Sequence, residues 1–205
     1  MCPTNDRADH EPHLTLFTVH LGDEVGDVMN AEYQVLEMNE QQQKLYEQLL
    51  NAQPTSAAKD RFLRTMEQFV LDYGWWYSPS PLPDQIESGT AQQCHKNAQI
   101  LSTEHDGLIY CEGFTLFKDG MSRTLHSWVT DGQGRAFDNT WSEPGVAYAG
   151  VPFKDLFVTM TNLKNHASIS MLDDHQNDYP LRGELGNQPD EWYEQAGEGL
   201  AKISS

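Results

Sequence analysis

The sequence predicts an α+β protein in which a helix carrying a cysteine packs on an antiparallel sheet, behind an N-terminal helical hairpin. Two observations predict this class. Apolar residues recur at helical spacing in the first third of the chain, and a series of strand-like segments follows a probable helix that begins near Cys94. The 205 residues are enough for one well-buried core.

The expected organisation is one catalytic domain with a short extension at each end. We expect a flexible N-terminus over 1–12, a single domain over 13–180 and a loosely held acidic tail over 181–205. Within the domain, 13–77 is the helical N-terminal part and 84–166 carries the cysteine helix and the strands.

The N-terminal part reads as two helices and an aromatic cluster. Helical spacing of apolar residues predicts a first helix over 28–51, and Ser56 is a suitable N-cap for a second helix that stops at Gly74. The aromatic residues 75–77 are expected to fill a core or a seam rather than to line a cleft. The prolines of 78–83 predict an extended connector.

Cys94 is expected near the start of the next helix. Thr90 and Gln93 have the spacing of a capping box, which places Cys94 within or just after the first turn. There the free backbone amides and the helix dipole favour the thiolate over the thiol. The segment 105–107 is expected to end the helix. Taken alone, a cysteine such as Cys94 is more often a small, buried and inert hydrophobe, and it is the strands downstream that favour a nucleophile.

The residues that follow predict three strands, over 108–117, 124–129 and 135–139. If the last turn is a three-residue loop, His126 lies directly opposite Asp138 on the same face. A two- or four-residue loop places Asn139 opposite His126 instead, and an amide can also orient a histidine. Both registers give His126 a polar partner, although a surface pair without a catalytic role has the same pattern.

These residues suit a thiol nucleophile, a base and an orienting group. Cys94 would attack a carbonyl, His126 would move the proton and Asp138 would hold the imidazole. The Cys94 backbone N–H, with Gln92 or Gln93, would stabilise the oxyanion. The side chains expected to wall the substrate cleft are Trp128 and Trp141.

Composition limits the partners. With 13 basic and 31 acidic residues and a net charge of −18, the chain is poorly suited to bind nucleic acid phosphates and better suited to a basic partner. Three cysteines without a paired spacing indicate reduced thiols and a cytoplasmic protein. No apolar run is long enough for a membrane span, and the N-terminus lacks a signal-peptide pattern.

Four motifs together resemble the core of the transglutaminase-like branch of the papain-type fold. More closely, they are similar to a set of bacterial and phage proteins with a Cys-His-x-Asn-Ala helix, a Tyr-x-Glu-Gly strand, a His-x-Trp strand and an Asp-x-Thr-Trp close. The similarity covers about 90 residues. The motifs here are Cys94-His95-Lys96-Asn97-Ala98, Tyr110-Cys111-Glu112-Gly113, His126-Ser127-Trp128 and Asp138-Asn139-Thr140-Trp141.

The resemblance implies a Cys94-His126-Asp138 triad acting on a protein or peptide-like substrate, without a metal or other cofactor. It implies hydrolysis or transfer of an amide, isopeptide or thioester acyl group, including deamidation. Cys111 also stands in a Cys-Glu-Gly context, but it lies in a strand without a following helix, so Cys94 is the expected nucleophile.

Two other functions remain open. One is a non-catalytic acidic binding or inhibitor protein on the same scaffold. The other is a zinc protein, although irregular ligand spacing argues against it. Its candidate ligands are Cys94, His95, His105, Cys111 and His126.

Overall fold

The computed structural model describes residues 38–52, 62–195, 197 and 200–203. The flexible N-terminus expected over 1–12, the first part of the helix expected over 28–51 and the Ser56 cap lie outside the described residues.

Two N-terminal helices pack on each other. The second is shorter than the helix expected between Ser56 and Gly74, because residues 62–65 are not helical. Helix α1 spans Glu40–Leu50 and begins with a capping box between Asn39 and Gln42. Helix α3 spans Met66–Tyr73, with the Thr65 side chain accepting a hydrogen bond from the Gln68 backbone N–H. Both helices contact β2 and β5 of the sheet described next.

Five strands close into a small barrel in the order β1-β4-β3-β2-β5. Strand β1 closes it, because it pairs in parallel with β4 and antiparallel with β5, whereas the other neighbours are all antiparallel. The fold is therefore mixed α+β with a barrel rather than an open sheet. The strands are β1 Trp75–Ser80, β2 Ile109–Leu116, β3 Arg123–Thr130, β4 Arg135–Phe137 and β5 Ala147–Pro152.

Strand β1 corrects one expectation. The aromatic residues 75–77 and the first part of the connector expected over 78–83 form a single strand. Proline is compatible with this strand because Pro79 pairs only with β4, whereas the pairing with β5 is confined to residues 75–77. The aromatic cluster supplies Tyr77 to the barrel interior, in agreement with the expectation of a core role.

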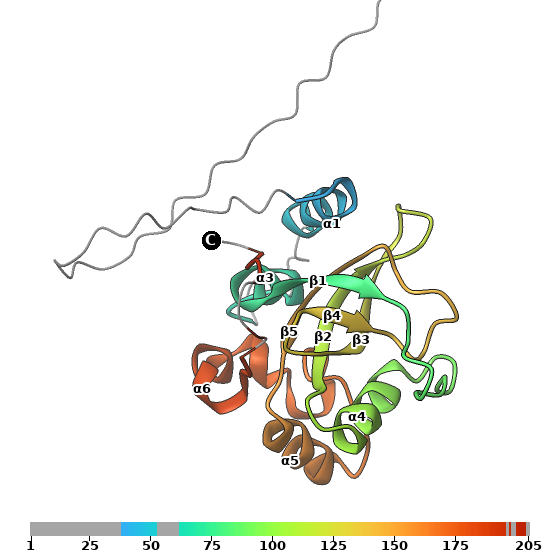
Figure 1. Ribbon diagram of the computed structural model, residues 1–205. Coiled ribbons are helices and arrows are strands. Elements are labelled where there is room, and N and C mark those ends of the chain that lie inside the picture. The colour runs from blue at the N-terminus through green and yellow to red at the C-terminus, as the bar shows by residue number, and fades with distance from the viewer. Residues whose placement is uncertain (1–37, 53–61, 196, 198–199, 204–205) are drawn as a thin grey trace, which may run out of the picture. The chain divides into compact units, whose positions relative to one another are not determined.

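Two helices cover one side of the barrel. Helix α4 spans Cys94–Glu104 and packs on β2 and β3, while α5 spans Asp155–Asn165 and packs on α4 (Figure 1). Helix α4 ends before His105, as predicted, but it begins at Cys94 and so later than a cap at Thr90 would place it. Its packing on β3 is what brings the cysteine near His126.

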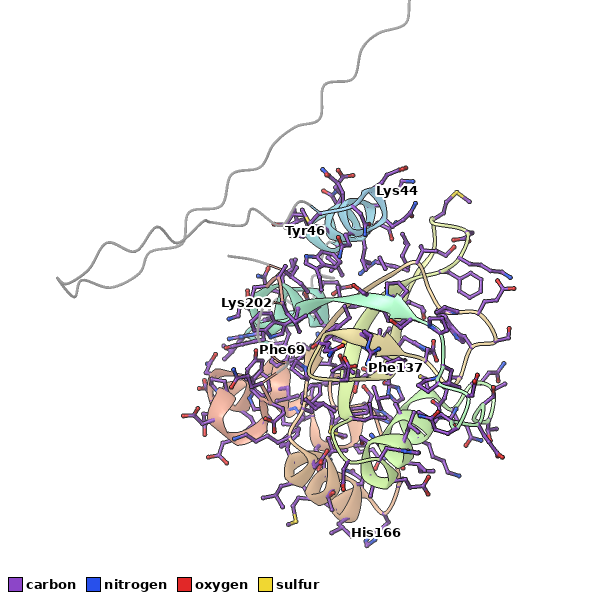
Figure 2. The ribbon with its side chains drawn as sticks, in the orientation of Figure 1. Lys44, Tyr46, Phe69, Phe137, His166 and Lys202 are labelled. Carbon is purple, nitrogen blue, oxygen red and sulfur yellow. The ribbon has the colours of Figure 1, made fainter. Side chains whose placement is uncertain are left out.

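The apolar core has two parts. The larger one lies between the barrel and the helices and includes Phe69 of α3, which Figure 2 labels. Phe69 packs on Trp192 with ring centroids 4.9 Å apart. The smaller one fills the barrel. It consists of Tyr77, Cys111, Trp128, Ala136 and Tyr148.

The segment after Pro180 is more ordered than the loosely held acidic tail that we expected. It forms the short helices η2 Pro180–Arg182, η3 Glu184–Asn187 and α6 Pro189–Trp192, after η1 His175–Asn177. Leu181 and Trp192 are fully buried, and Ile203 donates its backbone N–H to Gly74. The apolar residues outweigh the acidic composition here, because they complete the larger core. Among the described helices, none has the length and apolarity needed to cross a membrane.

Candidate active site

Cys94 is the first residue of α4. The expected capping box between Thr90 and Gln93 is wrong, because the Gln93 side chain makes no capping hydrogen bond. The Asn97 side chain holds this loop instead, accepting from the Thr90 N–H at 3.1 Å and donating to the Thr90 carbonyl at 2.7 Å and to Thr140 Oγ1 at 2.9 Å. No side chain caps the first turn beside Cys94, so its amides keep their capacity to bind a developing negative charge.

His126 and Asp138 form a buried pair. His126 Nε2 donates to Asp138 Oδ2 at 2.8 Å, since a carboxylate can only accept. The other Asp138 oxygen accepts from the backbone N–H groups of Thr140 at 2.8 Å and Trp141 at 3.2 Å. The Tyr148 hydroxyl also donates to Oδ2, at 3.3 Å. With four donors around it, the carboxylate has one fixed orientation.

The register that produces this pair differs from the expected one. Val129 lies opposite Phe137 and Thr130 opposite Ala136, so the loop is longer than predicted and the strands are offset by two residues. An offset of two keeps the same face, because side chains alternate along a strand. His126 and Asp138 are therefore diagonal neighbours, which remain within reach of each other. Strand β4 ends at Phe137 because Asp138 turns the chain through its own side chain.

Cys94 is the third member of the candidate triad. Its side chain is hydrogen-bonded to His126, and because Nε2 faces Asp138, the nitrogen that faces the sulfur is Nδ1. Burial by itself lowers the pKa of His126. The hydrogen bonds and charges of Asp138 and Cys94 outweigh burial and raise this pKa from 6.5 to about 9. At neutral pH the imidazole is thus a cation, which lies between the Asp138 side chain and the Cys94 sulfur.

This pair predicts a pH-dependent stability. Because the pKa of His126 is raised in the folded protein, its contribution is fully present below pH 6.5 and is lost as the pH rises through about 9. We expect the free energy of unfolding to fall over this range by up to roughly 3 kcal/mol, since one pKa unit corresponds to about 1.4 kcal/mol. Urea denaturation at several pH values measures the slope. The variant His126→Gln should lack it, and an identical slope in that variant would contradict the assignment.

The two tryptophans expected in the cleft have different locations. Trp141 stacks on the His126 ring at a centroid distance of 4.1 Å, and Phe117 packs edge-on against Trp141. Trp141 is only half-buried and so borders the site. The expectation for Trp128 is wrong, because it is fully buried inside the barrel between Tyr77 and Tyr148. Strand alternation points Trp128 inward, which the sequence did not indicate.

The remaining predicted residues lie next to Cys94 or Asp138 in the sequence. Gln92 and Gln93 are exposed in the turn before Cys94, and Gln92 has a left-handed backbone with φ of 64°. Asn139 is buried, and its backbone carbonyl accepts a hydrogen bond from the Gly89 N–H. The carboxylate that accepts from His126 is that of Asp138. Neither register left open by the sequence is the observed one, but of the two candidate partners Asp138 contacts the imidazole.

Cys111 lies inside the barrel and is fully buried. Burial raises the pKa of its thiol well above the ordinary value, so it is poorly suited to act as a nucleophile. The zinc ligands considered from the sequence do not form a metal-binding group. Within the described ranges, no group of three or more His, Cys, Asp or Glu side chains is arranged to hold a metal ion.

Sequence reasoning missed two features of the site. Tyr148 supports Asp138, and the Gly145 backbone N–H in turn holds the Tyr148 hydroxyl at 2.8 Å. His95, next to the cysteine, is bonded to Ser127, next to the histidine. Alternation along the strand expected over 124–129 could have separated the faces of His126 and Ser127, but it could not have shown what each side chain meets.

No family model matches this chain, and no curated protein or solved structure matches it. What the chain does is therefore inferred from its own residues.

Proposed function

We propose that this chain is a cysteine-dependent acyl-transfer enzyme: an amide, isopeptide or thioester hydrolase, a deamidase or a transamidase. Cys94 is the nucleophile, His126 the general base and acid, and Asp138 the orienting group. The observation that carries the proposal is the buried His126 ring, which bonds Asp138 on one side and Cys94 on the other. A buried imidazole between a thiol and a carboxylate is the arrangement that activates a thiol nucleophile.

The reaction proceeds through a covalent intermediate. The Cys94 thiolate forms a bond to the substrate carbonyl carbon, and the carbonyl oxygen takes the negative charge. The Cys94 backbone N–H stabilises this oxyanion together with a donor from Gln92 or Gln93. His126 gives its proton to the leaving amine or thiol as the carbonyl re-forms. Water or an amine then attacks the acyl-enzyme, with His126 accepting its proton and the sulfur leaving as thiolate.

The same observations support a transglutaminase-like, papain-type fold. Such a fold starts the helix with the nucleophile and places the histidine and the acid on consecutive strands, as here with α4, β3 and the end of β4. The net charge of −18 suits a basic protein or peptide substrate. Cys94 and Cys111 are free thiols, which suits a reducing cytoplasmic compartment.

An acylation experiment tests this function. We expect 4-nitrophenyl acetate to acylate wild-type protein at one site at neutral pH, and peptide mass spectrometry to locate the acetyl group on Cys94. Iodoacetamide should modify the same residue fastest, at a pH where an ordinary thiol with a pKa near 8.5 reacts slowly. Prior acylation should block this alkylation.

The chain supplies its own controls. Cys94→Ala should remove both reactions, and Cys111→Ala should leave both rates unchanged because that thiol is inside the barrel. Slow and equal labelling of the thiols, or a fast reaction that survives Cys94→Ala, would contradict the proposed function. A chain that instead keeps a binding activity unchanged after Cys94→Ala would favour a non-catalytic binding protein.

A further inference from the structure

The first turn of α4 is attached to β3 at two successive positions. The Cys94 side chain is hydrogen-bonded to His126. The next residue, His95, is hydrogen-bonded to Ser127, with Nδ1 at 2.6 Å from Oγ. Because His126 and Ser127 are neighbours on a strand, their side chains leave it on opposite faces. The helix start is thus held from both sides of β3.

The second attachment continues as a row of hydrogen bonds. Ser127 Oγ lies 3.1 Å from the Tyr110 hydroxyl, and this hydroxyl donates to Glu112 Oε2 at 2.9 Å. A carboxylate only accepts, so the row has one direction: His95 Nδ1–H to Ser127, Ser127 to Tyr110, and Tyr110 to Glu112. This direction assigns the proton of His95 to Nδ1.

Glu112 is a fixed end point for the row. It is completely buried in β2, and its oxygens also accept from the Ser170 hydroxyl and from the backbone N–H groups of Met171 at 2.7 Å and Leu172 at 3.2 Å. A buried carboxylate is costly unless it is satisfied in this way. The segment that follows α5 therefore fixes the position of the Glu112 carboxylate, and this carboxylate in turn fixes the orientation of the Tyr110 hydroxyl.

The row also lies within electrostatic range of the nucleophile. Burial, followed by the charge of Glu112, raises the pKa of Tyr110 well above its ordinary value, and the charge of Cys94 acts in the same direction. Tyr110 therefore keeps its proton and remains a donor. His95 Nδ1 also lies 3.8 Å from Glu112 Oε2, so a protonated ring would be attracted to the same carboxylate.

We propose that His95 is a positioning residue, which the Ser127–Tyr110–Glu112 row holds so that the first turn of α4 presents Cys94 to His126. This role rests on the proposed function of Cys94. The row touches neither the substrate nor the reacting atoms and acts through the orientation of the helix start. Displacement of a reacting group by about 1 Å can cost on the order of 100-fold in rate, so a weak anchor is sufficient to matter.

Two conservative variants weaken the row without creating a large cavity. Tyr110→Phe removes the hydroxyl that lies near both Ser127 and His95, and Ser127→Ala leaves His95 only the longer 3.3 Å contact with Tyr110. Tyr110→Phe and Ser127→Ala each remove one hydroxyl and leave the Ser170–Leu172 contacts of Glu112 intact. We expect the alkylation rate of Cys94 at neutral pH to fall roughly 10- to 100-fold in each. The rising limb of the alkylation rate against pH should move to higher pH, because Cys94 and His126 are no longer held together.

Thr115→Val is the matched control. Thr115 is on the same strand as Tyr110 and is fully buried, and among the described residues its hydroxyl has no hydrogen-bond partner. Removing it should leave the rate and its pH profile unchanged. If Tyr110→Phe and Ser127→Ala lower the melting temperature but leave the pH profile at the wild-type position, the row is merely structural and the proposal is wrong.

A second pair of variants tests His95 itself. His95→Asn places an amide N–H near the position of Nδ1, so it should keep most of the alkylation rate, whereas His95→Ala should lose it to the same degree as Ser127→Ala. Equal rates in both variants, whether high or low, would overturn the proposal. Failure of the proposed function can be told apart from failure of this proposal. In the first case, Cys94 of the wild-type protein would not be alkylated faster than an ordinary thiol.

Discussion

Replacing Asp138 with Asn is expected to slow acylation of Cys94 on the order of 10³- to 10⁴-fold while the chain remains folded. The structure gives the amide no satisfactory orientation. With its NH₂ toward His126, it forces the ring into the wrong tautomer and removes the charge that stabilises the imidazolium. With its oxygen toward His126, the NH₂ faces the N–H donors of Thr140 and Trp141.

The measurement is the rate of acetyl transfer from 4-nitrophenyl acetate to Cys94, with circular dichroism to verify folding. Asp131→Asn is the matched control, because Asp131 also accepts backbone N–H groups in a turn, from Gln133 and Arg135, at the other end of β4. That variant should acylate at the wild-type rate. A rate for Asp138→Asn within about tenfold of wild type would remove Asp138 from the proposed mechanism.

Gly113→Ala should destabilise the fold by about 3 kcal/mol or more, the largest stability effect that we expect from adding one methyl group. Gly113 lies in the middle of β2, opposite Gly150 on one side and His126 on the other. A Cβ here would lie 2.2 Å from the Ala149 carbonyl oxygen and 2.4 Å from the Gly150 Cα. Both are backbone atoms of β5, so relief requires separating two strands of the closed barrel.

Chemical denaturation followed by tryptophan fluorescence measures this effect. Gly132→Ala is its control, because a Cβ at Gly132 meets no atom within 4 Å. We expect the control to stay within about 0.5 kcal/mol of wild type. A Gly113→Ala protein as stable as that control would show that β2 and β5 are not so closely paired, and the position of His126 beside them would need revision.

Local pattern was sufficient for most elements. The boundaries of β2 and β3 and the end of α4 lie within one or two residues of those read from the sequence, because each combines an apolar pattern with a clear turn at its end. The pairing of β1 with β4 was not accessible in this way, because a parallel pair joins segments distant in the chain.

For the candidate site too, some residues could be predicted from the sequence and others could not. Cys94, His126 and Asp138 were selected as residue types at suitable spacing, and an error of two residues in the register did not change the face on which the pair meets. Trp128 was misplaced because a sequence does not tell which face of a strand becomes the inside of a barrel.

By itself, the sequence determined the identity and order of a thiol, an imidazole and a carboxylate, and the helix and strands that bear them. Only the tertiary structure decided that these three side chains meet, that Tyr148 and the Glu112 row support them, and that Cys111 is enclosed. The physical reason is that helical and strand periodicities arise from neighbouring residues. Closure of a barrel and burial of a charged group depend on free energies shared among segments far apart in the chain.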